Sequence, residues 1–178
     1  MNLVTKRVTG RMDGEFVVFM IGMRVNAWWK PHKWLPVAVA MPKMIKELTE
    51  KPELGFLGAE QWFGRTTIML QYWRSMEQLL DYAKSRDAAH LPAWRAFNKR
   101  VGTSGDVGIW HETYRVRAGD YENIYVNMPA FGLARVGKML DVGKSTSRRP
   151  GFAGSADGKR DGAKDRLIDQ AATAQGAG

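Results

Sequence analysis

The stretch from Glu15 to Val25 constrains the fold of this chain more than any other part of the sequence. It reads EFVVFMIGMRV, and its β-branched, aromatic and aliphatic residues fall on both alternating faces. A strand with this pattern needs apolar cover on both of its faces. The chain must therefore cover one face of a sheet with helices and find a second cover for the other face.

The segments that follow alternate between helical and strand-like patterns. Apolar spacing predicts a helix over 36–51, with a kink or restart at Pro42. Strands are predicted over 56–63 and 66–73, joined by a tight hairpin at Gly64 and Arg65.

A second helix and further strands complete the pattern. Ser75 opens this helix, since its hydroxyl has the capping-box spacing to Gln78. The helix continues to Ala89, and another helical piece begins at Pro92, because proline favours the first helical position. The last strands are predicted over 107–116 and 121–128.

The order of these elements is strand, helix, strand, strand, helix, strand. It predicts an α+β fold of the ferredoxin-like βαββαβ type, with an antiparallel sheet and both helices on one face. The other face would carry apolar residues of the first strand and of Ile68 to Leu70, which is a large patch for a monomer. We predict a homodimer whose sheets close over each other and leave a cavity between each sheet and its helices.

Length and composition exclude several classes of protein. A chain of 178 residues fits one globular domain, and the lack of cysteine excludes disulfides, thiolate metal sites and cysteine nucleophiles. The net charge is +9, but the basic residues are scattered singly, which does not favour nucleic-acid binding. No secretory signal and no apolar run of membrane-spanning length are visible, so a cytoplasmic location is expected.

The composition changes near Lys144. Residues 145–178 are rich in glycine and basic residues and poor in large aliphatics, so they bury too little apolar surface to offset the entropy of ordering. We predict a folded domain over 1–144 and a disordered tail over 145–178.

Two histidines stand next to tryptophans and are the candidate chemical groups. His90, Trp94 and Phe97 share one face if the helix there is continuous. His111 lies in the middle of the predicted strand 107–116, beside Trp110. Imidazole is the commonest general acid or base near neutral pH and also a haem-iron ligand, although a structural role fits each histidine as well.

Other polar residues are weaker candidates for a pocket. Arg24 and Asn26 follow the first strand and could bind an anionic or carbonyl group, while Tyr125 and Asn127 could lie at a pocket mouth. Solvated loop and edge-strand positions explain them equally well. The segment WWKPHKW suits a lid, a membrane-interface patch or a dimer contact, because Trp and Lys favour such boundaries.

Six segments within residues 28–129 carry a resemblance to a known family: WWKPHKWLPVAVAMPKM, LGAEQWFGR, QYWRSMEQLLDYA, HLPAWRAFNKR, GIWHETY and YENIYVNMP. Together they resemble a monooxygenase-like family of the dimeric α+β barrel superfamily, of the antibiotic-biosynthesis-monooxygenase type. The resemblance implies a homodimeric oxidoreductase without metal or flavin, in which a substrate carbanion or phenolate reacts with oxygen. His111 would then be the base, with His90, Trp94 and Trp73 shaping the pocket.

The segments YAKSRDAAHLPAWRAF and IWHETY are also similar to the haem-containing aldoxime dehydratases, which are carbon-nitrogen lyases. That resemblance implies haem b, with His90 as the axial iron ligand and His111 as the distal acid-base group. Those enzymes are about twice as long, and their distal serine and arginine have no counterpart identified here. The third alternative is a non-catalytic binder of haem or of a hydrophobic ligand.

Overall fold

The central strand β2 (Phe16–Val25) has a hydrogen-bonded neighbour along each of its edges. In the computed structural model, which describes residues 2–85, 99 and 102–142, the sheet has the order β3-β4-β2-β5 and all pairs are antiparallel. The other strands are β3 (Phe56–Trp62), β4 (Ile68–Trp73) and β5 (Val107–Val116). This order is the ferredoxin-like arrangement that the sequence predicted.

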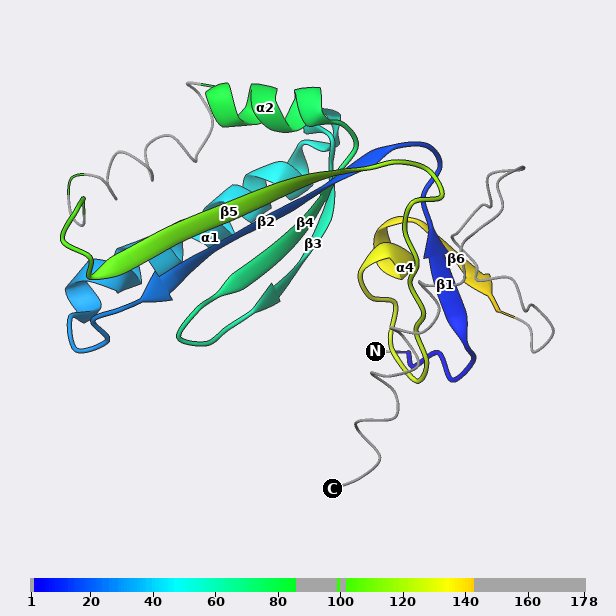
Figure 1. Ribbon diagram of the computed structural model, residues 1–178, viewed down its shortest axis with the longest axis horizontal. Helices are drawn as coiled ribbons and strands as arrows, with labels where there is room; N and C mark the ends of the chain where they lie inside the picture. Colours follow the sequence, from blue (N-terminus) through cyan, green and yellow to red (C-terminus); the bar gives the residue numbers. More distant parts are fainter. Residues whose placement is uncertain (1, 86–98, 100–101, 143–178) are drawn as a thin grey trace, which may run out of the picture.

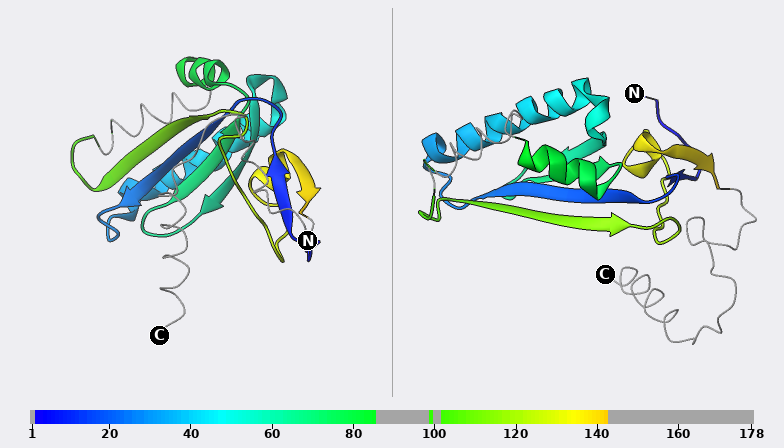
Figure 2. Two further views of the ribbon diagram at one scale, coloured as in Figure 1. Left: turned by 45° about the vertical axis from the view of Figure 1, so that its right-hand side comes forward. Right: turned by 90° about the horizontal axis from the view of Figure 1, so that it is seen from above.

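Helices α1 (Pro31–Glu50) and α2 (Met76–Lys84) lie on one face of this sheet, as Figures 1 and 2 show. Strand β2 pairs with β5 without interruption, from Phe16 opposite Val116 to Val25 opposite Val107. Val17 packs with Leu48 of α1, and Met23 packs with Trp34 of the same helix. Because side chains alternate along a strand and opposite residues share a face, the odd-numbered residues of β2 and β5 point toward the helices and the even-numbered ones point away.

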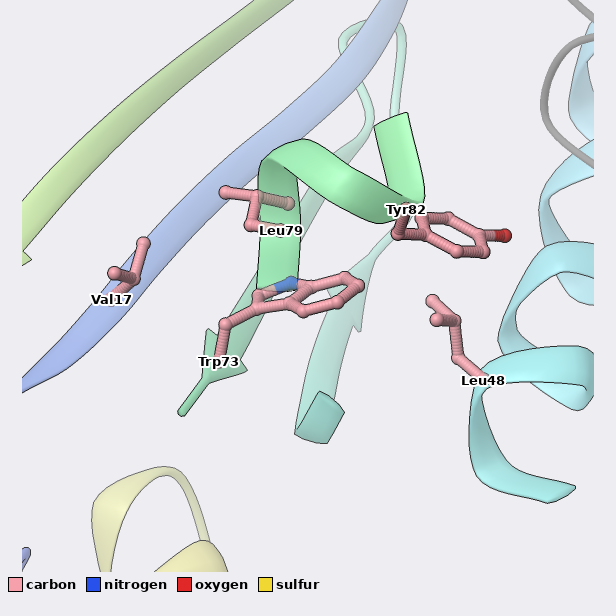
Figure 3. Close-up of a cluster of buried hydrophobic side chains, with 5 residues drawn as sticks. All are labelled: Val17, Leu48, Trp73, Leu79 and Tyr82. Carbon is pink, nitrogen blue, oxygen red and sulfur yellow. The ribbon is translucent and has the colours of Figure 1, made fainter. Parts of the chain in front are cut away.

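The core beneath the helices is built around Trp73, which is fully buried. Val17 lies beside it on the neighbouring strand, Leu48 packs from α1, and Leu79 and Tyr82 pack from α2 (Figure 3). The ring centroids of Trp73 and Tyr82 are 5.7 Å apart. This cluster ties both helices to the sheet through aromatic packing.

Helix α1 begins earlier than the sequence pattern predicted, at Pro31 rather than Pro36. Proline at the first helical position is favourable because that position has no intrahelical donor to lose. Pro36 and Pro42 lie inside a helix that is assigned as one piece, so the predicted restart at Pro42 does not occur. Each proline lacks the N–H that would bond the carbonyl four residues earlier.

Helix α2 begins as predicted, since the Ser75 hydroxyl accepts a hydrogen bond from the Gln78 N–H over 3.2 Å. The helix ends at Lys84, and Ser85 N–H donates to Asp81 O over 2.9 Å. The predicted continuation to Ala89 and the helical piece from Pro92 fall within residues 86–98, which lie outside the described residues.

Two predictions about the strands were wrong in detail. The connection between β3 and β4 spans five residues, 63–67, rather than a tight turn at Gly64 and Arg65. Residues 121–128 do not form a strand; Tyr125 and Met128 make only isolated bridges, to Val8 and Val4. The partners of this segment are near the N-terminus, so local pattern could not reveal how it is held.

A small unit beside the main sheet was not predicted. Strands β1 (Val8–Arg11) and β6 (Lys138–Asp141) pair antiparallel, and the short helix α4 (Leu133–Val136), which directly precedes β6, contacts both strands (Figure 1). Leu133 packs on Phe16 and Tyr72, which belong to the face of the main sheet that points away from α1 and α2. The unit therefore covers one end of that outer face.

The rest of the outer face stays partly open in the single chain. Among its residues, Ile68 and Tyr114 are exposed. The predicted domain limit at 144 and the tail 145–178 lie outside the described residues. None of the described helices is long and apolar enough to span a membrane.

Candidate functional site

A cavity of about 500 Å³ lies between the first half of α1 and the sheet. Sheet residues from all four strands line it: Ile21, Gly22, Met23 and Val25 of β2, Gln61 of β3, Met69 of β4 and Ile109 of β5. From α1 the lining residues are Trp34, Val37, Ala38 and Met41, which recur at the i, i+3, i+4, i+7 spacing of one helical face. The cavity is therefore walled mostly by apolar side chains, as small-molecule sites usually are.

Three polar side chains also line this cavity, and all come from β3 or the 63–67 connection: Gln61, Arg65 and Thr67. Thr67 is fixed by the backbone of β2, because its hydroxyl accepts from Met23 N–H over 3.0 Å. Arg65 Nε donates to Val25 O over 3.2 Å, and Val25 N–H donates to Arg65 O over 2.8 Å. The site thus combines an apolar interior with one positioned guanidinium charge.

The loop between β2 and α1 forms one side of the cavity mouth, with Trp28 in the lining. Its backbone is anchored, since Asn26 and Ala27 both donate to Asp106 O over 3.0 Å. The Lys30 ammonium also lies 2.9 Å from the Asp106 carboxylate. That hydrogen bond and charge lower the pKa of Asp106 below its ordinary value of 3.8.

His111 lies beside the cavity, on the helix-facing side of β5. It is directly opposite Ile21 and two residues from Ile109, both of which line the cavity. Its ring centroid is 5.8 Å from that of Phe19, and its side chain is exposed in the single chain. His90, Trp94 and Phe97 lie outside the described residues.

Trp73, Arg24 and Asn26, three further pocket candidates from the sequence, lie in two different surroundings. Trp73 lies in the helix-side core, and its Nε1 donates to Gln71 Oε1 over 2.9 Å. Arg24 and Asn26 lie at the cavity end of β2, where Arg24 donates to Thr66 Oγ1 over 2.8 Å and Asn26 donates to Gly105 O over 2.9 Å.

Tyr125 and Asn127 belong to the small unit and not to the cavity wall. The Tyr125 hydroxyl accepts from Leu133 N–H over 3.1 Å, and burial raises the pKa of this tyrosine. Asn127 has a φ of 54°, a left-handed conformation that asparagine tolerates better than most residues. The structure therefore brings neither residue together with the residues around the cavity.

Sequence reasoning missed most of the cavity wall. The sequence pattern around Phe63, Arg65 and Thr67 predicted a hairpin and gave no sign that these residues line a cavity. The α1 side of the wall had a visible signal, the i, i+3, i+4, i+7 spacing from Trp34 to Met41. Among the described residues, no group of three or more His, Cys, Asp or Glu side chains is arranged to hold a metal ion.

Comparison with known proteins places the chain in context. The monooxygenase af470 of Aspergillus fumigatus is 31% identical over 133 residues, which cover 68% of this chain and 46% of that protein. The chain thus spans about half the length of this relative.

Solved structures with a similar fold are more distant in sequence. SnoaB, a cofactor-independent oxygenase from Streptomyces nogalater, is 12% identical with a TM-score of 0.42, covering 58% of this chain and 94% of that one. A Bacteroides thetaiotaomicron protein described as a possible oxidoreductase is 10% identical with a TM-score of 0.43, covering 58% and 100%.

The sequence profile of one protein family matches residues 16–133, which include every strand of the main sheet, both covering helices and the described cavity wall. The chain belongs to the monooxygenase af470-like family.

Proposed function

We propose that this enzyme oxidises a small apolar or aromatic molecule that binds in the cavity beneath α1. The observation that carries the proposal is the cavity itself, because an apolar wall with one guanidinium suits a flat hydrophobic molecule bearing a hydroxyl or carbonyl group. Membership of a monooxygenase family supports oxidation over simple binding.

The reaction class that we propose needs no resident cofactor. A phenol loses its proton to a base, and the resulting anion transfers electrons to O₂. One oxygen atom forms a new carbonyl on the substrate and the other leaves as water, so a phenol and O₂ give a quinone and water. The substrate is the reductant in this scheme.

We assign the base to His111 and the stabilisation of the substrate anion to Arg65. His111 borders the cavity through Ile21 and Ile109 and is exposed, so a bound phenol can approach its ring. Imidazole can accept a proton near neutral pH. The Arg65 guanidinium is held in place by its hydrogen bond to Val25 O, so its positive charge favours the ionised over the neutral substrate.

Oxygen uptake with a panel of bicyclic phenols, beginning with 1-naphthol, tests this proposal. His111→Ala should lower the rate by about a hundredfold, as expected for the loss of a general base. His32→Ala is the matched control, because His32 is an exposed histidine of α1 that does not line the cavity. An unchanged rate in His111→Ala would remove His111 from the mechanism.

The competing hypothesis is a haem enzyme that uses His90 as the iron ligand. It predicts a Soret band in protein purified from haem-supplemented cells, and that band should disappear in His90→Ala. Such a band would contradict the cofactor-free proposal. A colourless protein that consumes oxygen only with the phenol would contradict the haem hypothesis.

We also propose that the enzyme is a homodimer whose outer sheet faces pack together. The small unit covers only the end of this face near Phe16 and Tyr72, and Ile68 and Tyr114 remain exposed beyond it. Tyr114→Lys should shift the protein toward the monomer in sedimentation equilibrium, because a charge would replace an apolar ring in the interface. Wild-type protein that sediments as a monomer would contradict the proposal.

A further inference from the structure

An exposed apolar patch lies on the loop after β2, on α1 and on the β3–β4 connection, three segments that also line the cavity. Its residues, here called the entrance patch, are Trp28, Trp29, Leu35, Val39 and Phe63. Trp28 is 70% exposed, Trp29 63% and Phe63 81%. The loop after β2, the start of α1 and the β3–β4 connection lie at the same end of the sheet (Figures 1 and 2).

The exposure of these rings is fixed by the fold rather than by a loose loop. The Trp34 indole donates to Trp28 O over 3.1 Å, and Lys30 N–H donates to Ala27 O over 3.1 Å. The rings of Trp28 and Trp29 meet edge to face, with centroids 6.3 Å apart. The backbone therefore holds two large aromatic side chains in water, an arrangement that usually indicates a docking surface.

The charges around the entrance patch are almost all positive. The sequence has no acidic residue between Glu15 and Glu47, and none between Glu60 and Glu77. Of the basic residues in these stretches, Lys30 lies in the loop, Lys33 at the start of α1 and Arg65 in the connection. Arg24 lies next to the loop, at the end of β2. Among the described residues, the Asp106 carboxylate contacts this region, where it is paired with Lys30.

We propose that the entrance patch docks on an anionic phospholipid surface. Tryptophan side chains partition into the interface between headgroups and acyl chains, and lysine and arginine are attracted to anionic headgroups. Trp28 and Phe63 also line the cavity, so an apolar molecule dissolved in the bilayer could enter without crossing water. Positive charge complements anionic lipid, and this complementarity favours lipid over a neutral protein surface.

The patch lies apart from the outer sheet face that we assign to the dimer. Leu35 and Val39 are on the exposed side of α1, and Phe63 faces the cavity beneath that helix. Docking on lipid and pairing of subunits therefore use different surfaces.

Vesicle co-sedimentation of the full chain tests the proposal without substrate or turnover, so its failure would leave the proposed oxidation untouched. We expect binding to phosphatidylcholine vesicles with about 30 mol % phosphatidylglycerol and weak binding to pure phosphatidylcholine. Raising NaCl from about 0.1 M to about 0.5 M should weaken binding, because salt screens the headgroup charge. Wild-type protein that does not bind the anionic vesicles would overturn the proposal.

Matched variants locate the binding surface. Trp28→Ser combined with Phe63→Ser should lower the partition coefficient by about tenfold or more, whereas Leu3→Ser combined with Leu140→Ser, which removes two exposed apolar side chains elsewhere, should not. If the first variant is unfolded by circular dichroism, Trp29→Ser replaces it, since Trp29 does not line the cavity. Equal binding by the folded patch variant and wild type would overturn the proposal.

Discussion

The Trp73 indole and the Gln71 side-chain amide form a buried hydrogen-bonded pair on the helix-facing side of β4. Trp73 Nε1 donates to Gln71 Oε1 over 2.9 Å, and Gln71 Nε2 lies 3.3 Å from the sulfur of Met69. Gln71 is 5% exposed and Trp73 is 1% exposed. Met69 lines the cavity, so this chain of contacts connects the core around Trp73 to the cavity wall.

Replacing Gln71 should destabilise the protein through its partner. In Gln71→Leu the Trp73 indole would be a buried donor without its acceptor, which costs about 1–3 kcal/mol. The free energy of unfolding from urea titration, followed by far-UV circular dichroism, measures this loss. Gln61→Leu is the control because Gln61 is exposed, and it should change the free energy by less than about 0.5 kcal/mol. Equal effects of the two substitutions would contradict the proposed importance of the pair.

The N-terminus of α2 depends on Ser75. Ser75→Ala removes the acceptor for Gln78 N–H and should lower the free energy of unfolding by about 1 kcal/mol. Ser75→Asp keeps an acceptor at the same position and should restore most of this loss, also because an acidic group favours a helix N-terminus. Urea titration of both variants gives the answer, and an alanine variant as stable as wild type would show that the cap contributes nothing measurable.

The parts of the fold that could be predicted from sequence are those with a strong local signal. The strand 107–116 was predicted at its exact bounds, and Ser75 was identified as the start of a helix, because alternation and capping are encoded within a few residues. The start of α1 was missed because the tryptophan, proline and lysine residues from Trp28 to Trp34 resemble a loop in composition.

Long-range contacts explain what the sequence did not reveal. Val8 pairs with Asp141, and these strands of four residues carry no distinguishing pattern. Residues 121–128 have strand-like composition, but the tertiary structure gives them only isolated bridges. Arg65 and Thr67 reach the cavity because their backbones continue the hydrogen bonding along β2 before β4 begins. This placement depends on the register of the strands rather than on residue type.

The ion pair between Lys30 and Asp106 should make stability depend on pH. The pKa of Asp106 is lowered in the folded state, so the unfolded chain binds a proton more readily and the stabilisation is present above the ordinary value of 3.8. It should be lost as the pH falls through the folded pKa. The difference in free energy of unfolding between wild type and Asp106→Asn should therefore be largest near pH 6 and shrink toward about pH 2.

The control for this measurement is Asp120→Asn, which removes a carboxylate from the loop after β5. Its difference from wild type should vary less with pH than that of Asp106→Asn. A constant difference for Asp106→Asn over the whole range would show that Lys30 does not stabilise the ionised carboxylate.

Filling the cavity should block ligand binding without unfolding the protein. Ala38 lies on the cavity face of α1, and a phenylalanine there would occupy part of the 500 Å³ that the proposed substrate needs. Ala38→Phe should weaken binding of 1-naphthol by about tenfold or more in isothermal titration calorimetry, because the ring takes the place of the ligand. Val39→Phe, which adds the same ring one residue later on the exposed side of α1, should bind 1-naphthol like wild type. Because the ring enters existing space, the stability of Ala38→Phe should stay within about 1.5 kcal/mol of wild type.

Unchanged affinity in a folded Ala38→Phe would show that the phenol binds outside this cavity, and the proposed site would then be wrong.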